Sequence, residues 1–390
     1  MKYINDNIEY GLEYDWDKIN KKFKSLKIPK DVYNPSKLDF TVSKYFLLLS
    51  ERSIGKTTNV LLYGMCMYIL YGTVIQYVRQ KPESIEPRNV RDLFDTILAN
   101  NYITKLTDGK YNSVTLKAKR WYLCKIDSDG KIEEIDTNHF MFMCAVLKGE
   151  DLKSSYNAPT GDFIVYDECI NTYYYPNEFV LFCDLVKTII RERRSPIIIM
   201  LANTIDKHSE YFNELGIYEQ VQTLFQGQNM TIKNPTGTTV YVEIIGKTIE
   251  KAKKRSVLNA LFFGFKNPKL ASITGADWAI KNYQHIPSFE IEYLSRRIYI
   301  YHNDRYISLD IVKSDELGYC VYVHWATKTY PDSIILTLDD RYDSRYIYKL
   351  GSGRLGKMLN HLYKENRFYY ATNDVGAFFD NYLKLCSKTT

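Results

Sequence analysis

The sequence predicts an α/β domain with a mainly parallel sheet, followed by a smaller α+β domain. In the first part of the chain, short apolar runs alternate with helical segments, which is the pattern of parallel strands covered on both faces. A glycine-containing loop, Ser50 to Thr57, joins one such run to a helix. Turn-rich polar sequence then leads into aromatic and β-branched strands. We therefore expect a first domain at 1–225 that begins with a polar extension, a linker at 226–258 and a second domain at 259–390.

The elements of the first domain follow from its apolar pattern. The expected strands are Tyr45 to Leu49, Val74 to Val78, Arg120 to Ile126, His139 to Val146, Phe163 to Tyr166 and Ile197 to Leu201. Helical spacing of apolar residues predicts helices after the loop, from Asp92 to Leu106 and from Pro176 to Arg194. An Asp-Gly pair at 129–130 indicates a turn between two of the strands.

The second domain is expected to contain mainly strands. Three runs of aromatic and β-branched residues predict them: Arg297 to Tyr301, Tyr306 to Val312 and Tyr319 to Trp325. The first two are joined by an Asn303-Asp304 turn. Ahead of this domain lies a basic helical segment from Lys247 to Arg255.

Composition and charge limit the class of protein. With 390 residues, 45% of them hydrophobic, the chain is long enough for two buried cores. Its net charge of +6 would suit a polyanionic partner but is far below that of proteins that bind nucleic acid by charge density alone. Seven scattered cysteines without a CxxC pair argue against a zinc site and indicate thiols of a reducing cytoplasm.

Neither export nor membrane insertion is expected. The amino-terminal residues lack the basic and then apolar pattern of a signal peptide. The most apolar stretch, Val60 to Val78, contains two glycines and a glutamine, so a buried helix that runs into a strand is favoured over a membrane span. We therefore expect a soluble protein.

The loop between the first strand and its helix matches the phosphate-binding pattern of P-loop proteins, although Ser50 replaces the usual first glycine. Backbone amides of such a loop surround the phosphates, and the helix N-terminus adds its positive end. Lys56 would reach the β- and γ-phosphates, and Thr57 would complete a Mg²⁺ shell. The alternative is a chance Gly-Lys-Thr at a helix start. The expected ATP-binding residues are Ser50, Glu51, Arg52, Ser53, Ile54, Gly55, Lys56, Thr57 and Thr58.

Two carboxylates follow a later apolar strand, as in a Walker B motif. Asp167 is expected to bind Mg²⁺ together with Thr57, and Glu168 to act as general base on the attacking water. Taken alone, the pair could equally begin a solvated loop. Asn203 follows the next strand and is our candidate for a residue that contacts the γ-phosphate or the water, although asparagine in this position is often a turn residue.

A basic group closes the helix that precedes this last strand. It contains Arg191, Arg193 and Arg194. Basic residues at a helix C-terminus interact favourably with the helix dipole, which is one explanation. The other is an arginine finger that completes the site of a neighbouring subunit, because arginine remains charged and binds phosphate through two hydrogen bonds.

With these motifs in order, the chain resembles the DNA-encapsidation ATPases of small, short-tailed, protein-primed phages, a compact branch of the terminase large-subunit superfamily. The resemblance covers most of the chain. It is carried by Ser50 to Thr57, the segment Tyr77-Val78-Arg79-Gln80-Lys81-Pro82-Glu83, Lys153-Ser154, Ile164 to Glu168, Thr188 to Arg194 and Leu201 to Asn203. The Y-V-R-x-K-P-E and Lys-Ser segments are more specific than the ATPase motifs, which many unrelated enzymes share.

The resemblance implies an ASCE-type ATPase that forms a ring, expected to be pentameric, in the host cytoplasm. The ring docks transiently on the portal protein of the prohead and moves double-stranded DNA into it. A packaging RNA between ring and portal is compatible with the resemblance and is not required by it. The implied catalytic residues are Lys56, Glu168 and Asn203 within one subunit, with Arg191 and Lys153 acting on a neighbour's nucleotide. Arg193 remains an alternative to Arg191.

For the second domain, the resemblance implies an RNase H-like fold that larger terminases use as a nuclease. Such nucleases need several carboxylates, beginning on the first strand, to hold two metal ions. Arg297 to Tyr301 contains none. The available carboxylates lie at or beyond strand ends, namely Asp310, Asp332, Asp339 and Asp340. We therefore expect a domain without nuclease activity.

Contact with DNA is expected from the basic segment before the second domain. Its cations are Lys247, Lys251, Lys253, Lys254 and Arg255. Lysine-rich surface helices are often simply solvated, and this remains the alternative. For the whole chain, two other functions stay open: a terminase with a working nuclease, and a nucleotide-binding structural switch without appreciable turnover. Glu168 argues against the switch.

Overall fold

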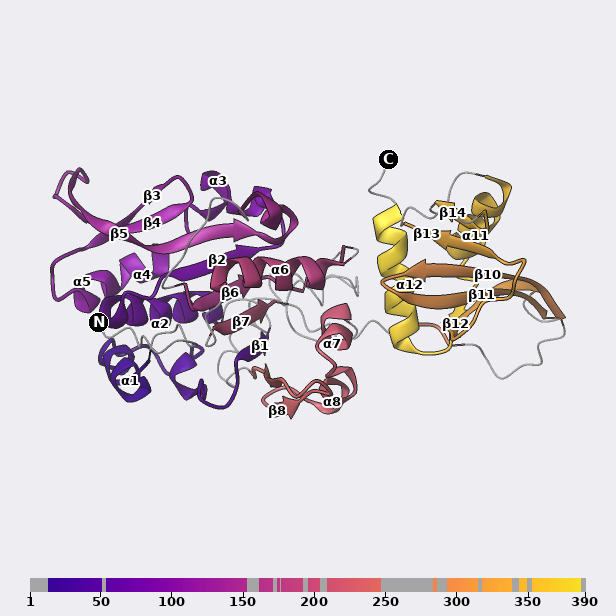
Figure 1. Ribbon diagram of the computed structural model, residues 1–390, viewed down its shortest axis with the longest axis horizontal. Coiled ribbons are helices and arrows are strands. Elements are labelled where there is room, and N and C mark those ends of the chain that lie inside the picture. Colours follow the sequence, from indigo (N-terminus) through magenta and orange to yellow (C-terminus); the bar gives the residue numbers. More distant parts are fainter. Residues whose placement is uncertain are drawn as a thin grey trace, which may run out of the picture. The chain divides into compact units, whose positions relative to one another are not determined.

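The computed structural model describes residues 13–50, 54–152, 161–170, 174–175, 177–191, 196–203, 209–246, 283–285, 293–314, 318–338, 344–348 and 353–386. The chain divides into two compact units, each built around its own sheet (Figure 1). The second unit contains Ile280–Thr390 and two short segments from earlier in the chain, Thr172–Asn177 and Asp206–Asn213. The remaining residues make up the first unit.

The first unit contains a nine-stranded sheet in the order β3-β4-β5-β2-β6-β7-β1-β9-β8. Neighbouring strands from β5 to β9 in this order run parallel, and β3, β4 and β8 pair antiparallel at the two edges. The expected mainly parallel sheet is therefore confirmed. The strands are β1 (Tyr45–Leu49), β2 (Ile75–Arg79), β3 (Ser113–Lys117), β4 (Arg120–Ile126), β5 (Ile132–Ala145), β6 (Phe163–Asp167), β7 (Ile197–Ala202), β8 (Asn229–Lys233) and β9 (Thr239–Ile244).

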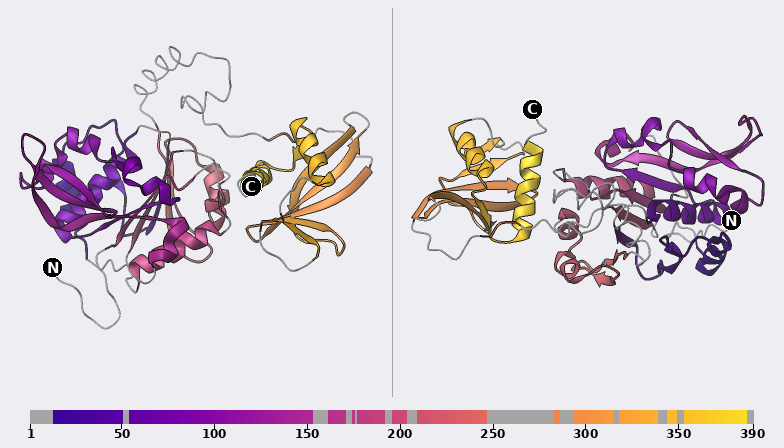
Figure 2. Two further views of the ribbon diagram at one scale, coloured as in Figure 1. Left: turned by 90° about the horizontal axis from the view of Figure 1, so that it is seen from above. Right: turned by 180° about the vertical axis from the view of Figure 1, so that it is seen from behind.

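Helices cover both faces of this sheet (Figure 2). One face packs against α1, α2, α4 and α5 in a core that includes Phe46, Tyr77 and Val165. Tyr166 points to the opposite face, because side chains alternate along a strand, and it stacks on Phe182 of α6 with ring centroids 4.8 Å apart. The helices of this part are α1 (Trp16–Ser25), α2 (Lys56–Tyr71), α3 (Pro87–Val90), α4 (Asp95–Ala99), α5 (Tyr102–Leu106), α6 (Glu178–Ile190) and α8 (Tyr218–Thr223), with 3₁₀ turns η1 (Pro35–Lys37), η2 (Pro82–Ile85) and η3 (Val146–Leu152). Helix α7 (Glu210–Glu214) belongs to the second unit except for its last residue.

Helix α2 lies unusually close to the sheet because Gly64 has no side chain. A Cβ atom at Gly64 would lie 2.8 Å from Ile75 and 2.9 Å from Phe163. These distances are shorter than normal carbon contacts, so only glycine permits this approach. The close contact fixes the middle of α2 against β2 and β6, whose carboxyl ends carry the candidate site.

The structure differs from the sequence-based expectations in two helices, in the linker and in the start of β5, which begins at Ile132 instead of His139. The expected helix at 92–106 is broken into α4 and α5 at Asn100 and Asn101, where Asn101 has a left-handed φ of 54°. The expected helix at 176–194 ends at Ile190, and Arg191 is left-handed with φ 49°. The expected linker at 226–258 is wrong in its first half, because β8 and β9 complete the first unit's sheet, with β9 parallel to β1.

The second unit is an α+β arrangement around a six-stranded sheet in the order β14-β13-β10-β11-β12-β15. Helices α11 and α12 pack on one face of it, against Ile300, Leu309 and Val323 among others. The expected Asn303-Asp304 turn is present, with φ of 47° and 55°. The elements are β10 (Tyr293–His302), β11 (Arg305–Ser314), β12 (Gly318–Ala326), β13 (Ile334–Thr337), β14 (Tyr346–Tyr348), β15 (Phe368–Tyr370), α11 (Arg354–Lys364) and α12 (Asn373–Cys386).

Candidate active site

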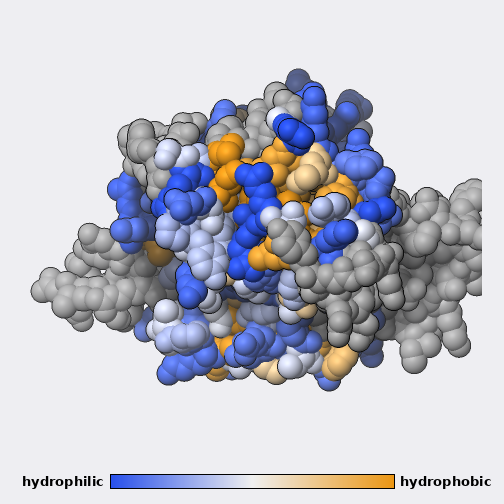
Figure 3. All heavy atoms as spheres, turned by 90° about the vertical axis from the view of Figure 1, so that its right-hand side faces the viewer, coloured by the Kyte–Doolittle hydropathy of each residue, from blue (hydrophilic) through white to orange (hydrophobic). Residues whose placement is uncertain are grey.

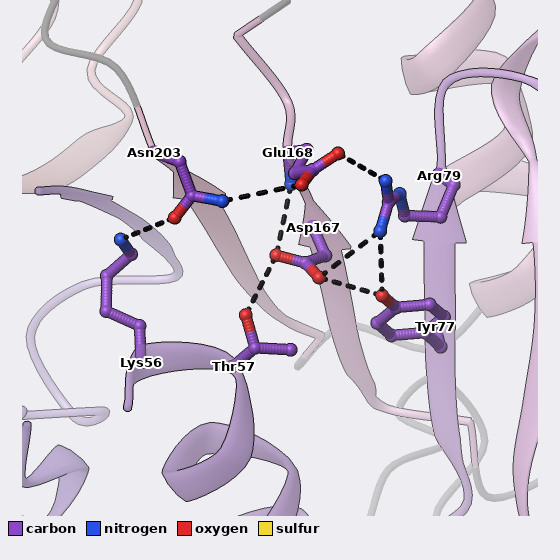
Figure 4. A network of polar contacts seen from close by, with 7 residues as sticks. All are labelled: Lys56, Thr57, Tyr77, Arg79, Asp167, Glu168 and Asn203. Atoms are coloured by element: carbon purple, nitrogen blue, oxygen red, sulfur yellow. Dashed lines mark hydrogen bonds and ion pairs between the residues drawn. The ribbon is translucent and has the colours of Figure 1, made fainter. Parts of the chain in front are cut away.

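Four neighbouring strands of the first unit deliver the candidate site. They lie in the order β2-β6-β7-β1 and run parallel, so their carboxyl ends meet at one edge of the sheet. Arg79 ends β2, Asp167 ends β6, Asn203 follows β7 and Ser50 follows β1. In open α/β sheets this edge is where ligands bind. Figure 4 shows how the polar side chains from these elements converge.

Lys56 occupies the first turn of α2 and points into this group of side chains. Gly55 before it has a φ of 74°, a left-handed conformation that turns the loop into the helix. Lys56 is 4% exposed, and its ammonium donates hydrogen bonds to Ser50 Oγ and, at 3.1 Å, to Asn203 Oδ1. Burial lowers the pKa of Lys56 from 10.5 to about 8. A phosphate anion bound beside Lys56 would raise this pKa again, because a nearby negative charge stabilises the ammonium form.

Ser50, the departure from the glycine of the P-loop pattern, has a role in this geometry. Its side chain is fully buried, and its backbone N–H donates to the Ala202 carbonyl at 3.1 Å. Its hydroxyl accepts a hydrogen bond from Lys56. A glycine could not provide this acceptor, so the serine satisfies the buried ammonium in the protein without ligand.

Thr57 and Asp167 form the oxygen pair expected for a magnesium ion. The Thr57 hydroxyl donates to Asp167 Oδ1 at 3.0 Å. Both groups carry the hard oxygen ligands that Mg²⁺ prefers, and Mg²⁺ commonly takes only one or two protein ligands beside water and phosphate oxygens. These residues therefore fit such an ion.

Glu168 lies just beyond β6 and is held by Arg79. Its φ of 53° is left-handed, which takes the chain out of the strand direction and costs energy in a residue other than glycine. Arg79 forms an ion pair with Glu168 and lies 3.6 Å from Asp167 Oδ2. The Tyr77 hydroxyl donates to the same Asp167 oxygen at 2.7 Å. Burial lowers the pKa of Arg79. The electrostatic interactions with Tyr77, Asp167 and Glu168 raise it by more, so the pKa lies above its ordinary value.

Asn203 connects the two halves of the site. Its side-chain oxygen accepts from Lys56, and its Nδ2 lies 3.4 Å from Glu168 Oε1 in a long hydrogen bond. One amide therefore contacts both the phosphate-binding lysine and the candidate general base (Figure 4). This position suits a residue that responds to the presence of a γ-phosphate.

A pocket of about 440 Å³ opens beside these residues. Its size is within the range of small-ligand sites. Part of its wall is the expected phosphate loop and Asn203. The remaining lining residues were not expected from the sequence. They are Ile28, Pro29, Val32, Asn59, Thr96, Asn100 and Tyr102.

The structure thus brings together most of the expected site residues that it describes. These are Ser50, Ile54, Gly55, Lys56, Thr57, Thr58, Asp167, Glu168 and Asn203. Arg191 lies elsewhere, exposed at the end of α6. Outside the described residues lie Glu51, Arg52, Ser53, Lys153, Arg193, Lys247, Lys251, Lys253, Lys254 and Arg255.

Tyr77 and Arg79 are the site residues whose role the sequence did not reveal. They belong to the Y-V-R-x-K-P-E segment, which carries the resemblance but had no assigned chemistry. A strand that ends in arginine at the same sheet edge as an Asp-Glu pair is the signal that could have indicated this pairing.

In the second unit, the expectation that Asp310 lies at or beyond a strand end is wrong, because Asp310 is buried within β11, where protein groups occupy its carboxylate. Arg297 donates two hydrogen bonds to it, at 2.7 and 2.5 Å, and Ser308 donates a third at 2.6 Å. Burial raises the pKa of Asp310, but these bonds and one from His324 outweigh burial and hold it well below its ordinary value. Among the described residues of both units, no group of three or more His, Cys, Asp or Glu side chains could hold a metal ion.

The surface of the second unit, seen in Figure 3, mixes hydrophobic and strongly hydrophilic side chains.

The fold and the arrangement at the sheet edge define the class: an α/β protein with the phosphate loop, acidic strand end and parallel sheet of P-loop nucleotide-binding proteins. Comparisons with known proteins agree with this class. No protein-family model matches the chain. The DNA packaging proteins of Bacillus phages phi29 and PZA are each 26% identical to it over 198 residues, which cover 50% of this chain and 52% of theirs. The chain therefore spans about half the length of the curated relatives it matches.

A solved structure extends the likeness to nearly the whole chain. It is described as the bacteriophage Phi-29 viral genome packaging motor assembly, and it matches 92% of this chain and 100% of its own with a TM-score of 0.58 and 16% identity. At this identity the likeness is one of fold. The resemblance to packaging ATPases that the motifs indicate is thus confirmed by sequence and by fold. In the described part of the chain, no helix has both the length and the hydrophobicity needed to cross a membrane.

Proposed function

We propose that this chain is the ATP-hydrolysing subunit of a motor that moves double-stranded DNA into a phage prohead through the portal. The observation that carries the proposal is the convergence of Lys56, Thr57, Asp167 and Glu168, with Asn203 between them, at one sheet edge. The similarity to phage DNA packaging proteins supplies the direction.

Each side chain has a distinct part in the proposed hydrolysis. Lys56 holds the β- and γ-phosphates, and Thr57 and Asp167 would hold Mg²⁺, which neutralises charge on the phosphate oxygens when it is bound. Glu168 accepts the proton of the attacking water. Arg79 forms an ion pair with Glu168 and holds this carboxylate at the sheet edge. Asn203 contacts both Lys56 and Glu168 and would align them.

Two variants test the proposed division of roles. Lys56→Ala should abolish nucleotide binding, whereas Glu168→Gln should bind nucleotide and lose hydrolysis by about 10²-fold or more, because general-base catalysis is worth about that much. Binding is measured by calorimetry and hydrolysis by phosphate release. Near-normal turnover by Glu168→Gln would remove Glu168 from its assigned role. Manganese-dependent nicking of plasmid by the unaltered protein would instead support the nuclease alternative.

We also propose that the subunits form a ring, expected to be pentameric, in which Arg191 or Arg193 and Lys153 act on a neighbour's nucleotide. The exposed position of Arg191 at the end of α6 supports this. Mixing Arg191→Ala chains with Lys56→Ala chains should restore hydrolysis, because each supplies what the other lacks and an arginine finger is worth about 10³-fold or more. Arg354→Ala, which alters an exposed arginine at the start of α11, is the matched control. Absence of rescue in confirmed mixed rings would assign Arg191 to its own subunit.

The proposed partners are double-stranded DNA, the portal protein and, where the phage has one, a packaging RNA, all met in the host cytoplasm. DNA contact through Lys247, Lys251, Lys253, Lys254 and Arg255 remains part of the proposal. A contact with the DNA backbone should weaken steeply with salt and depend little on base sequence. Charge reversal at Lys251, Lys253 and Lys254 should flatten the salt dependence of DNA binding while basal hydrolysis persists.

A further inference from the structure

The pocket beside the phosphate loop continues past the residues that a triphosphate needs. Part of its lining comes from α4, α5 and the turn between them, which contribute Thr96, Asn100 and Tyr102. A second wall consists of the apolar side chains Ile28, Pro29 and Val32. A nucleotide whose phosphates lie at Lys56 must place its base and sugar somewhere in this pocket.

The α4–α5 turn presents Asn100 in a fixed orientation. The chain leaves the helical conformation at Asn100, with φ −95° and ψ 6°, and Asn101 is left-handed. The Asn100 side-chain nitrogen donates to the Thr96 carbonyl at 2.8 Å. Lys105 Nζ holds the Asn100 carbonyl at 3.1 Å, which ties the turn to α5.

These bonds leave the side-chain oxygen of Asn100 open to a ligand. One of the two N–H groups of the amide donates to Thr96, and among the described residues no hydrogen bond reaches its Oδ1. Since the amide cannot turn over without losing the bond to Thr96, Oδ1 is a hydrogen-bond acceptor of fixed identity that lines the pocket.

A fixed acceptor distinguishes the two purines. Adenine carries an amino group at position 6, which donates a hydrogen bond, whereas guanine carries an oxygen there, which accepts. Opposite Asn100 Oδ1, adenine would gain a hydrogen bond, and guanine would place two acceptors face to face. The apolar wall of Ile28, Pro29 and Val32 suits the flat face of either base.

We infer that the α4–α5 turn is the base-reading element of this site, with Asn100 Oδ1 accepting a hydrogen bond from the 6-amino group of adenine. This inference rests on the proposed function to the extent that the bound nucleotide lies in this pocket. It assigns Asn100 to base selection, a role separate from the chemistry at Glu168.

The test compares three nucleotides on the full-length protein: ATP, GTP and purine riboside triphosphate, which has hydrogen in place of the amino group. The unaltered protein should prefer ATP over the purine analogue by roughly 3- to 10-fold in kcat/KM, the value of one hydrogen bond. It should prefer ATP over GTP by roughly 10- to 100-fold, because the facing acceptors remain unpaired. The differences should lie in KM, with kcat nearly unchanged, since the base is bound equally in ground and transition states.

Asn100→Ala should lower kcat/KM for ATP to the value for the purine analogue and leave the analogue unaffected. Asn100 is exposed in the nucleotide-free protein, so the variant is expected to fold. Asn138→Ala is the matched control, because Asn138 is also exposed and only its backbone forms hydrogen bonds. Retention of the full preference for ATP over the analogue by Asn100→Ala would overturn the inference, as would equal use of the two by the unaltered protein.

Equilibrium binding separates failure of this inference from failure of the proposed function. Calorimetry measures the dissociation constants of ATP and the purine analogue, with and without Asn100→Ala. Binding that prefers ATP through Asn100, without hydrolysis of any nucleotide, would contradict the ATPase and leave base reading in place. Hydrolysis of all three nucleotides at equal kcat/KM would contradict base reading and leave the ATPase in place.

Discussion

Each charged side chain of the candidate site has a protein partner in the absence of nucleotide. Lys56 is held by Ser50 and Asn203, and Glu168 is paired with Arg79. Such pairing is what buried charges require, because a charge removed from water without a partner is strongly unfavourable. Nucleotide and magnesium therefore bind by replacing existing contacts, and their measured affinity includes the free energy of breaking them.

The lowered pKa of Lys56 leads to a pH dependence of nucleotide binding. With a pKa of about 8 in the free protein, Lys56 loses its proton as the pH rises above 8, whereas the phosphate-bound form requires the ammonium. Binding then includes proton uptake. The dissociation constant of a non-hydrolysable ATP analogue should be nearly constant below about pH 8 and rise by up to about tenfold per pH unit above it.

Calorimetry between pH 7 and 9.5, in buffers with different ionisation enthalpies, measures both the affinity and the proton uptake. Lys56→Arg keeps its charge throughout this range and should lose the pH dependence even if it binds more weakly. An equally steep rise for Lys56→Arg would assign the titration to another group.

Arg79 is expected to be essential for the stability of the nucleotide-free protein. Arg79→Leu leaves Asp167 and Glu168 side by side without their positive partner, and it should lower the free energy of unfolding by about 2–4 kcal/mol, as when one partner of a buried ion pair is removed. Magnesium and nucleotide supply positive charge at the same place, so their addition should stabilise this variant more than the unaltered protein.

Urea denaturation with and without magnesium and an ATP analogue measures these differences. Arg88→Leu is the control, because the ion pair of Arg88 with Glu86 is exposed and contributes little. Equal stabilisation of Arg79→Leu and the unaltered protein by the ligand would contradict the role assigned to Arg79.

At the scale of elements, the sequence predicted best the strands that are buried on both faces. The limits of β1 agree with the expected run from Tyr45 to Leu49, and β6 and β7 each extend one residue beyond theirs. The reason is physical: a strand covered on both faces needs a continuous apolar run, which few other structures produce. The motif residues at the ends of these strands consequently lie at the expected sheet edge.

Strands and contacts whose partners lie far away in the sequence could not be predicted from local apolar patterns. Strands β8 and β9 are short and separated by a turn at Asn234 and Gly237, so they look like a linker until β9 pairs with β1, nearly two hundred residues earlier. The pairing of Arg79 with Glu168 spans 89 residues and leaves no local pattern. The break between α4 and α5 is indicated only by two consecutive asparagines, which helices tolerate.

The packing of α2 on the sheet predicts an unusual response to Gly64→Ala. In an exposed helix this change is stabilising by about 1 kcal/mol. Here the added methyl group would lie 2.8 Å from Ile75, and overpacking of this kind typically costs about 1–3 kcal/mol. We expect a net loss of stability in urea denaturation. A stabilised Gly64→Ala would contradict the close packing.

At the scale of the whole molecule, the described nucleotide-site residues all belong to the first of the two units. A ligand that binds one unit should raise the melting temperature of that unit alone. At a concentration of 100 times its dissociation constant, an ATP analogue adds about 2.7 kcal/mol, which corresponds to roughly 5–8 °C for a unit of this size.

Scanning calorimetry should therefore resolve two transitions, of which one shifts with magnesium and nucleotide. Asp310→Asn weakens the ion cluster with Arg297 in the second unit and should lower the other transition. A single transition that responds to both changes would show that the two units unfold together.

The order of strands in the first unit also has a consequence for synthesis on the ribosome. Strand β1 lies between β7 and β9, so neither of its neighbours exists when it leaves the ribosome. About 200 residues must follow before β9 is complete, which takes roughly 10–40 s at 5–20 residues per second. Until β7 has been made, both edges of the apolar segment Tyr45–Leu49 are unpaired, and the edge that pairs with β9 stays unpaired for the whole interval, so the segment is open to association with other nascent chains. Chaperones that bind extended apolar segments would therefore be expected to meet this protein first at β1.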